Sequence, residues 1–313
     1  MEACISGRMG KHIEKAMVRR TKPALSLALF GCLVGHAAWA AKPELVGACG
    51  FDRQAMQFQG PPLVQAACLL RDVRPWGRVD TASVEVPESV SRLVGQPTDS
   101  WKAPLRRWLA HLGLSEQDVG GPLDAPVSAA AREDGAAVSA RYFVIHDTSW
   151  PWFGAHDFPP EADPHMNDLS RYAHASTALA HVFVNRLGRT LTTHDFSEPW
   201  RATKLEMRAA GVPVKGLFLH VELVQPRRSD PAGPAGNDAQ APLPGFTPAQ
   251  YDMLALLYLA ASVRAGEGLI PALHGALDEG LIDGHDDPQN FLLTAFAAAL
   301  ARLEQQLSAL SVP

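Results

Sequence analysis

The sequence predicts an α/β fold in which helices flank a mixed central sheet, preceded by a small, mainly helical module. The first observation is a series of short apolar runs rich in β-branched and aromatic residues, of which Tyr142–Ile145 is the clearest. The second is that longer apolar stretches with helix-start signals, such as Thr247-Pro248, are interspersed with these runs. The third is a hairpin signal at Leu187-Gly188, which adds an antiparallel strand to the sheet.

The first forty residues have the features of a signal peptide, with a basic start, an apolar middle and a small-residue exit. These features lie at Arg19, Arg20 and Lys22, at 24–38, and at Ala38-Trp39-Ala40. We therefore expect cleavage after Ala40 and a periplasmic or secreted product with no membrane span. Two alternatives stay open: Met17 as the true start, and an uncleaved membrane anchor.

The charge of the chain argues against a nucleic-acid partner. Removal of residues 1–40 takes away six basic and two acidic residues, so the net charge changes from −5 to −9. A protein that binds nucleic acid needs a cationic surface. Beyond residue 40, the largest clusters of basic residues are the pairs Arg106-Arg107 and Arg227-Arg228.

Residues 41–124 are expected to form the small helical module, because short helical patterns alternate there with proline and glycine. These patterns lie at 63–70, 88–94 and 104–112. Cys49 and Cys68 are an even pair in an exported protein, so we expect a disulfide, with two buried free thiols as the alternative. Residues 125–138 are small and polar, as in a linker, and lead to a domain over 139–313.

Strands and then helices are expected in that domain. The strands are a buried one ending at His146, a hairpin over 181–186 and 189–192, and a further strand over 217–224. A helix is expected to begin at Thr247-Pro248 and another at Asp287-Pro288, since each pair puts an N-cap residue before a proline at the first helical position.

Two histidines that end apolar runs are candidate metal ligands. His146 closes the first strand, and His274 closes the run over 269–274. The acidic stretch that follows ends at Asp287. Two histidines and one later carboxylate, with a fourth position left for water, are a typical ligand set of catalytic zinc. Each residue also has a structural alternative, which for Asp287 is the N-cap of the closing helix.

Glu222 is the candidate general base. Strand alternation over 219–224 puts His220 and Glu222 on one face and Val221 and Leu223 on the other. A buried glutamate is costly unless it has a partner or a task, such as taking a proton from a reacting water. The alternative is an edge-strand glutamate paired with Arg201 or Lys204.

These motifs resemble, in their order, those of the type-2 N-acetylmuramoyl-L-alanine amidases, a family that includes phage lysozyme-type amidases and is related to the peptidoglycan recognition proteins. The resemblance rests on strand-ending His146, His181-Val-Phe-Val-Asn-Arg-Leu-Gly-Arg, Val221-Glu222-Leu223, Phe246-Thr-Pro-Ala-Gln-Tyr251, and His274 with Asp287-Pro288. It covers about residues 140–305 and does not extend to the amino-terminal module.

The resemblance implies zinc-dependent hydrolysis of the amide between N-acetylmuramic acid and L-alanine in peptidoglycan or muropeptides. It implies that His146, His274 and Asp287 hold Zn²⁺ and that Glu222 is the catalytic carboxylate. Loop residues that fall where substrate would lie are Trp150, Trp152, Arg201 and Lys204. The alternative, from a different functional class, is a non-catalytic peptidoglycan-binding module of the same fold.

The chain departs from the family near its third ligand. Two residues before that ligand the family commonly has a lysine, and here the position holds His285. A histidine there can stabilise an oxyanion, but its charge depends on pH near neutrality, whereas that of lysine does not. The stretch from His274 to Asp287 is also longer than usual, so Asp286, Asp283 and His285 stay open as alternative third ligands.

Overall fold

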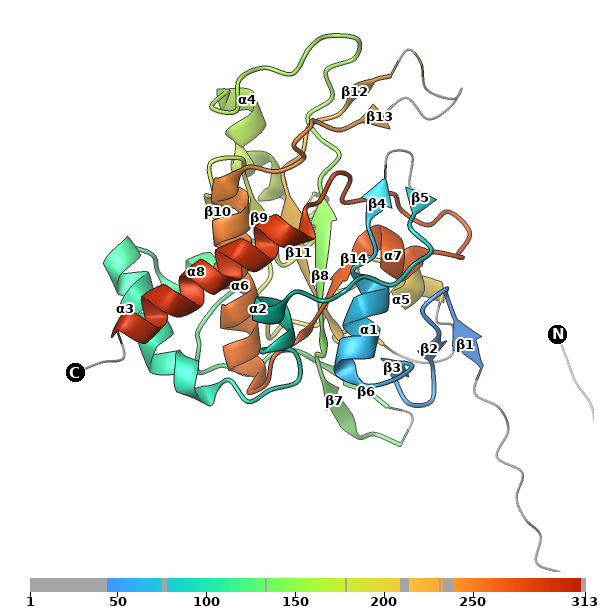
Figure 1. The fold of residues 1–313 in the computed structure, drawn as a ribbon, viewed down its shortest axis with the longest axis vertical. Coiled ribbons are helices and arrows are strands. Elements are labelled where there is room, and N and C mark those ends of the chain that lie inside the picture. Colours follow the sequence, from blue (N-terminus) through green and yellow to red (C-terminus); the bar gives the residue numbers. More distant parts are fainter. Residues whose placement is uncertain are drawn as a thin grey trace, which may run out of the picture. The chain divides into compact units, whose positions relative to one another are not determined.

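The central sheet has the strand order β10-β9-β11-β8-β14. Its strands are β8 (Tyr142–Asp147), β9 (Val182–Val184), β10 (Thr190–Thr192), β11 (Phe218–Leu223) and β14 (Ile270–Leu273). Pairing is parallel except between β9 and β10, which form an antiparallel hairpin. The mixed sheet and the hairpin at Leu187-Gly188 are therefore confirmed, and Figure 1 shows helices on both sides of the sheet.

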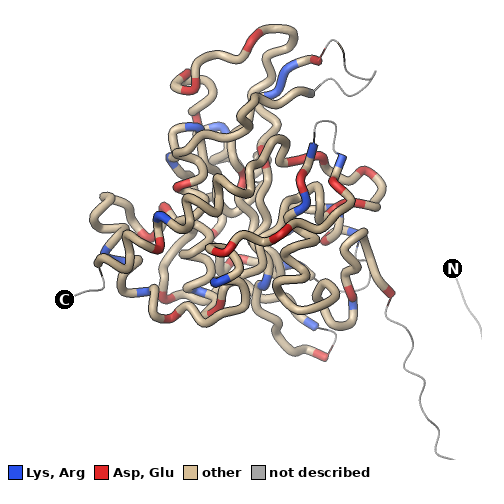
Figure 2. The backbone as a smooth tube through the Cα atoms, viewed as in Figure 1, with Lys and Arg blue, Asp and Glu red and all other residues tan. Residues whose placement is uncertain are grey.

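This computed structural model describes residues 44–74, 78–132, 134–177, 179–208, 214–230, 232 and 239–310. The signal peptide expected over 1–40 lies outside these residues. Residues Pro43–Pro313 make up one compact unit. Within the described residues, no helix is both long and apolar enough to cross a membrane. Acidic and basic residues are interspersed along this part of the chain (Figure 2).

The helices of the described residues have the following bounds: α1 Pro62–Leu69, α2 Glu88–Ser91, α3 Lys102–Leu112, α4 Pro164–Asn167, α5 Lys204–Arg208, α6 Pro248–Ala265, α7 His274–Asp278 and α8 Leu293–Leu310. The short strands outside the central sheet are β1 Leu45–Val46, β2 Phe51–Asp52, β3 Gln57–Phe58, β4 Val73–Arg74, β5 Arg78–Val79, β6 Ala129–Ala131, β7 Ala137–Ser139, β12 Arg228–Ser229 and β13 Ala239–Gln240.

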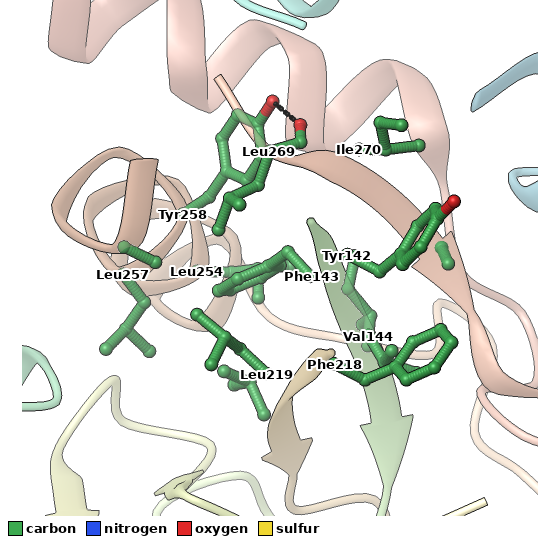
Figure 3. Close-up of a cluster of buried hydrophobic side chains, with 14 of the residues drawn as sticks. Tyr142, Phe143, Val144, Phe218, Leu219, Leu254, Leu257, Tyr258, Leu269 and Ile270 are labelled. Carbon is green, nitrogen blue, oxygen red and sulfur yellow. Dashed lines mark hydrogen bonds between the residues drawn. The ribbon is translucent and has the colours of Figure 1, made fainter. Parts of the chain in front are cut away.

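Both faces of β8 are buried, and different parts of the chain cover them. Phe143 points toward α6, where its ring meets that of Tyr258 at 5.4 Å between centroids (Figure 3). On the opposite face, Tyr142 stacks on Phe218 of β11 at 4.9 Å. A strand buried on both faces reads as a continuous apolar run, which explains the clear signal of this segment.

The amino-terminal segment covers the face that carries Tyr142. The Tyr142 hydroxyl donates a hydrogen bond to Gln65 Oε1 of α1 at 2.8 Å and accepts one from the backbone N–H of Phe58 at 3.0 Å. Residues 44–124 thus contain short strands as well as helices and share one hydrophobic core with the sheet. A separate helical module is not confirmed, and part of the segment predicted as a linker lies in the β6–β7 hairpin.

One helix start follows the expectation and the other does not. Thr247 caps α6, because its side chain accepts a hydrogen bond from the backbone N–H of Gln250 and Gln250 bonds back to Thr247. The closing helix α8 begins at Leu293, so the start expected at Asp287-Pro288 is wrong. The physical reason is that the Asp287 carboxylate is used elsewhere, against His274, and is not free to cap a helix.

Cys49 and Cys68 form the expected disulfide, with 5.9 Å between their Cα atoms. The bridge joins the turn after β1 to helix α1. Nearby, the backbone N–H of Ala48 donates to the carbonyl of Glu279, directly after α7. The disulfide therefore ties the amino-terminal segment together beside the helix that begins with His274.

Replacing both cysteines with serine is expected to lower the free energy of unfolding by about 3 kcal/mol, because the unfolded chain loses a crosslink. The enclosed loop is short, since the two cysteines are 19 residues apart. Denaturant unfolding of the metal-free protein measures this change. Added reductant should shift the wild-type midpoint and leave that of the double variant where it is; equal midpoints without reductant would contradict the prediction.

Candidate metal centre

His146, His274 and Asp287 meet at one edge of the sheet. His146 lies near the carboxyl end of β8, and His274 directly follows β14, the parallel neighbour of β8. Asp287 reaches the same place from the loop before α8. The two Nδ1 atoms are 2.8 Å apart, His274 Nδ1 is 2.9 Å from Asp287 Oδ1, and His146 Nδ1 is 3.7 Å from Asp287 Oδ2. All three residues are buried, and this group could hold a metal ion.

The spacing of these atoms fits a tetrahedral zinc site. Zinc binds imidazole nitrogen and carboxylate oxygen at about 2.1 Å, so two ligand atoms of a tetrahedral site lie roughly 3.4 Å apart. The observed separations of 2.8, 2.9 and 3.7 Å lie on either side of that value. Small movements of the three side chains would therefore complete the site.

The far nitrogens of both rings have polar partners, which leaves the two Nδ1 atoms facing each other. His274 Nε2 lies 3.0 Å from Asp278 Oδ2, and His146 Nε2 lies 3.1 Å from His220 Nδ1. With a proton on each Nε2, the two Nδ1 lone pairs face each other and repel. A proton or a metal ion between them removes this repulsion.

The charges around the group favour one positive charge there. Burial lowers the pKa of His274, but Asp287 and Asp278 outweigh it and raise the pKa to about 10. Burial and the neighbouring His274 hold the pKa of His146 well below its usual value. Without metal, the proton therefore resides on His274 while His146 stays neutral.

Asp278 supports His274 from the opposite side. It ends α7, is fully buried, and also accepts hydrogen bonds from the backbone N–H groups of Lys204 and Leu205 at the start of α5. A carboxylate that accepts the second N–H of a ligating histidine fixes the tautomer and the ring orientation. Sequence reasoning did not assign Asp278 a role, although its i,i+4 spacing from His274 was a usable signal.

A buried ion pair holds the Asp287 segment. Arg227 Nη2 lies 2.7 Å from Asp147 Oδ2, and the same oxygen accepts a hydrogen bond from the backbone N–H of Gln289. The backbone N–H of Asp147 donates in turn to Asp287 Oδ2 at 3.1 Å. Asp147 thus links the strand that carries His146 to the loop that carries Asp287. Sequence reasoning missed the pair, because its members are 80 residues apart.

Glu222 lies beside His146, as its register partner on the neighbouring strand β11. Strand β11 is in the middle of the sheet, so the edge-strand interpretation is wrong. Among the described residues, Oε2 of Glu222 is buried without a hydrogen-bond partner, and no ion pair joins Glu222 to Arg201 or Lys204. Burial raises the pKa of Glu222 well above its usual value, and the negative charges of Asp287 and Asp147 raise it further.

His285 lies at the outer side of the group. Its ring stacks on that of His274, with 4.6 Å between centroids, and its Nδ1 is 3.5 Å from Asp287 Oδ1. Its side chain is 53% exposed, whereas that of Asp287 is 4% exposed, so His285 is the member that solvent reaches. The other two open alternatives have different partners: Asp286 accepts from Gln289, and Asp283 pairs with Arg208.

The four candidate substrate residues lie on two segments next to the group. Trp150 is partly buried under the guanidinium of Arg171, 4.2 Å from its ring, whereas Trp152 is 40% exposed. Both pair with the chain just after β11, since bridges join Trp150 to Gln225 and Trp152 to Arg227. Arg201 is exposed, and partly buried Lys204 begins α5 beside Asp278.

Comparisons with known proteins find little. No protein-family model matches the chain, and no curated protein matches it by sequence. A similar solved structure is described as the crystal structure of a selenomethionine AmpD derivative; it is 18% identical, with a TM-score of 0.31, and the match covers 58% of this chain and 98% of that one. At that TM-score the likeness supports no conclusion about the site.

Proposed function

We propose that this protein is a zinc-dependent N-acetylmuramoyl-L-alanine amidase, which hydrolyses the amide between N-acetylmuramic acid and L-alanine in peptidoglycan or muropeptides. The observation that carries the proposal is the buried His146–His274–Asp287 group with Glu222 beside it, whose buried Oε2 has no hydrogen-bond partner among the described residues. The ordered motifs that resemble the amidase family add the substrate class.

His146 and His274 would hold Zn²⁺ through Nδ1, and Asp287 through its carboxylate. When bound, the ion would supply Lewis acidity, which makes water easier to deprotonate and polarises a carbonyl. Glu222 would take the proton from a water molecule as the water oxygen attacks the lactyl carbonyl. The same carboxyl group would then give that proton to the alanine nitrogen as the carbon–nitrogen bond breaks. The products are a lactyl carboxylate and the free amine of the stem peptide.

The position of Glu222 suits both halves of this proton transfer. Its Oε2 is buried without a hydrogen-bond partner among the described residues, so it is free to take a proton from water and to give it to the leaving nitrogen. His285 is proposed to donate a hydrogen bond to the carbonyl oxygen as negative charge develops on it, because it is the exposed member of the group.

Substrate contacts are proposed for the residues that flank the group. Trp152 offers an exposed aromatic surface on which a sugar ring can stack. The ring of Trp150 is covered by the guanidinium of Arg171, so Trp150 would contact substrate mainly through its backbone. Arg201 and Lys204, near the start of α5, are proposed to pair with a peptide carboxylate. These contacts would orient the polymer across the metal centre.

Export is part of the same proposal. We propose from the sequence that residues 1–40 are a signal peptide and that the product is periplasmic or secreted. We also propose from the sequence a division into a 41–124 module, a 125–138 linker and a 139–313 zinc amidase domain. The Cys49–Cys68 disulfide supports the export, because such bonds persist in oxidising compartments.

Purified protein is expected to contain about one zinc per chain, as a three-residue catalytic site requires. It should release stem peptides with free alanine amino termini from purified cell walls. Removal of the metal by a chelator should stop this release, and added zinc should restore it. Amino-terminal labelling and mass spectrometry of the soluble products measure the effect.

The outcome also separates the enzyme from the alternative function. A zinc-loaded protein that sediments with cell walls but releases no peptide would favour the non-catalytic binding module. Peptide release that continues after complete zinc removal would contradict the metal-dependent reaction.

A further inference from the structure

The sheet face that carries His146 and Glu222 holds a row of buried polar side chains that the proposed reaction does not use. His220 of β11 is fully buried, and its Nδ1 lies 3.1 Å from His146 Nε2. Its other nitrogen, Nε2, lies 3.3 Å from Glu206 Oε2 without a hydrogen bond between them, and both side chains are closed to solvent. A buried histidine and glutamate in such a row are costly unless their polar atoms serve one another.

The hydrogen bonds along this row set the tautomer of each ring. If His146 binds metal through Nδ1, its proton is on Nε2, and His220 Nδ1 must accept that proton's hydrogen bond. The proton of a neutral His220 is then on Nε2, which faces the Glu206 carboxylate. With an ion on His146 Nδ1, the protons of both neutral rings are thus on Nε2.

His181 holds the far side of His220 in place. The backbone N–H of His220 donates to His181 Nδ1 at 3.0 Å, so His181 must carry its own proton on Nε2, which donates to the carbonyl of Glu198. The rings of His181 and His220 stack at 5.6 Å with an angle of 17°. The backbone of His220 thus selects the tautomer of His181, and the ring of His181 packs against that of His220.

Glu206 is held by the first turn of α5. Its Oε2 accepts hydrogen bonds from the backbone N–H groups of Ala202 and Thr203 and from the Thr203 hydroxyl. The same turn donates two backbone N–H groups to Asp278, the carboxylate that supports His274. One turn of the chain therefore lies beside both candidate ligand histidines. It donates to Asp278, which contacts His274, and it holds Glu206 3.3 Å from His220, which contacts His146.

We infer that His220, through the contact of its Nδ1 with His146 Nε2, is a positioning residue that holds His146 in the tautomer and ring orientation needed to bind the metal. This inference deepens the proposed function and rests on its metal site. It does not require His220 to touch substrate. Loss of a residue that supports a metal ligand typically weakens metal binding roughly 10–100-fold.

The test compares two replacements of nearly equal size. His220→Leu removes the acceptor that faces His146, whereas His220→Asn puts a carboxamide oxygen near the place of Nδ1. H220L is expected to bind zinc roughly 10–100-fold more weakly than wild type, and H220N is expected to lie closer to wild type than to H220L. Competition with a chelator of known zinc affinity measures this ranking in the full-length protein, independently of activity.

A third variant controls for general destabilisation. Thr98→Val removes a buried hydrogen bond to the carbonyl of Ser262, near the end of β14 opposite to His274. It is expected to lower stability and leave zinc affinity unchanged. Equal zinc affinity in H220L, H220N and wild type would overturn the inference, and so would an equal loss of affinity in T98V.

A measurement on the wild type covers the case in which H220L does not fold. Long-range ¹H–¹⁵N spectra of the zinc-loaded protein are expected to show His220 with its proton on Nε2. A proton on Nδ1 would overturn the inference. A zinc-loaded wild type that releases no peptide would contradict the proposed reaction, while the tautomer and the ranking of zinc affinities would still support the positioning role of His220. A wild type that binds no metal would overturn both the proposed reaction and the positioning role.

Discussion

Replacing Glu222 with glutamine is expected to lower the rate of peptide release from cell walls by roughly 10²–10⁴-fold, the range that general acid–base catalysis contributes. Glutamine has nearly the same shape but cannot take a proton from water. Zinc content should stay at the wild-type level, because Glu222 is not one of the three ligand residues. Initial rates of amino-terminus release, together with metal analysis of the same sample, measure both quantities.

The same variant has a second expected signature in the metal-free protein. The pKa of Glu222 is raised in the folded state, so the folded form binds its proton more tightly than the unfolded form does. Its contribution to stability is present below the unfolded pKa and is lost as the pH rises through the folded pKa. Glutamine does not become charged, so E222Q avoids this loss. The free energy of unfolding of metal-free E222Q should therefore be at least as large as that of wild type at neutral pH.

Glu267→Gln is the matched control for that experiment. Glu267 is exposed and lies before β14, at the end of the strand opposite to His274. This variant should keep the wild-type rate and zinc content. Wild-type activity in E222Q would place the general base elsewhere, and loss of zinc from E222Q would mean that Glu222 takes part in holding the metal.

Replacing Asp287 with alanine is expected to remove zinc and activity together. Asp287 is the carboxylate within ligand distance of both histidines, and it is almost fully buried. Its loss should weaken zinc binding by more than the roughly 10–100-fold that a supporting residue costs. Zinc competition and wall-digestion rates measure the two effects.

The neighbouring carboxylate provides the matched control. Asp286 is next in sequence, but its Oδ2 accepts a hydrogen bond from Gln289, and it is not one of the residues whose ligand atoms lie together. Asp286→Ala should therefore retain zinc and most of the activity. The reverse ranking, with zinc lost from D286A and kept in D287A, would make Asp286 the third ligand.

Local sequence patterns predicted several elements of this protein and the first members of its candidate site. The buried run ending at His146, the Thr247 cap and the hairpin were visible because each depends on neighbours a few residues apart. The alternation around Glu222 was visible for the same reason. Two histidines at strand ends were enough to suggest a metal, since parallel strands end at a common edge of the sheet.

Only the tertiary structure decided how these pieces meet. In the structure, Asp287 rather than Asp283 or Asp286 is the carboxylate beside the histidines. Helix α8 begins at Leu293 and not at Asp287-Pro288. The tertiary structure also placed the amino-terminal segment against the sheet, where Gln65 bonds to Tyr142. A local sequence pattern predicts none of these contacts, because each joins residues far apart in the chain.

The supports of the metal centre show the physical reason most clearly. His220 is 74 residues from His146, and Arg227 is 80 residues from Asp147. Local propensity acts over a few residues, whereas these pairs form because packing the sheet buries polar groups that must then satisfy one another. The sequence by itself therefore predicted which residues could hold a metal, and the packed structure decided which of them lie together and which groups surround them.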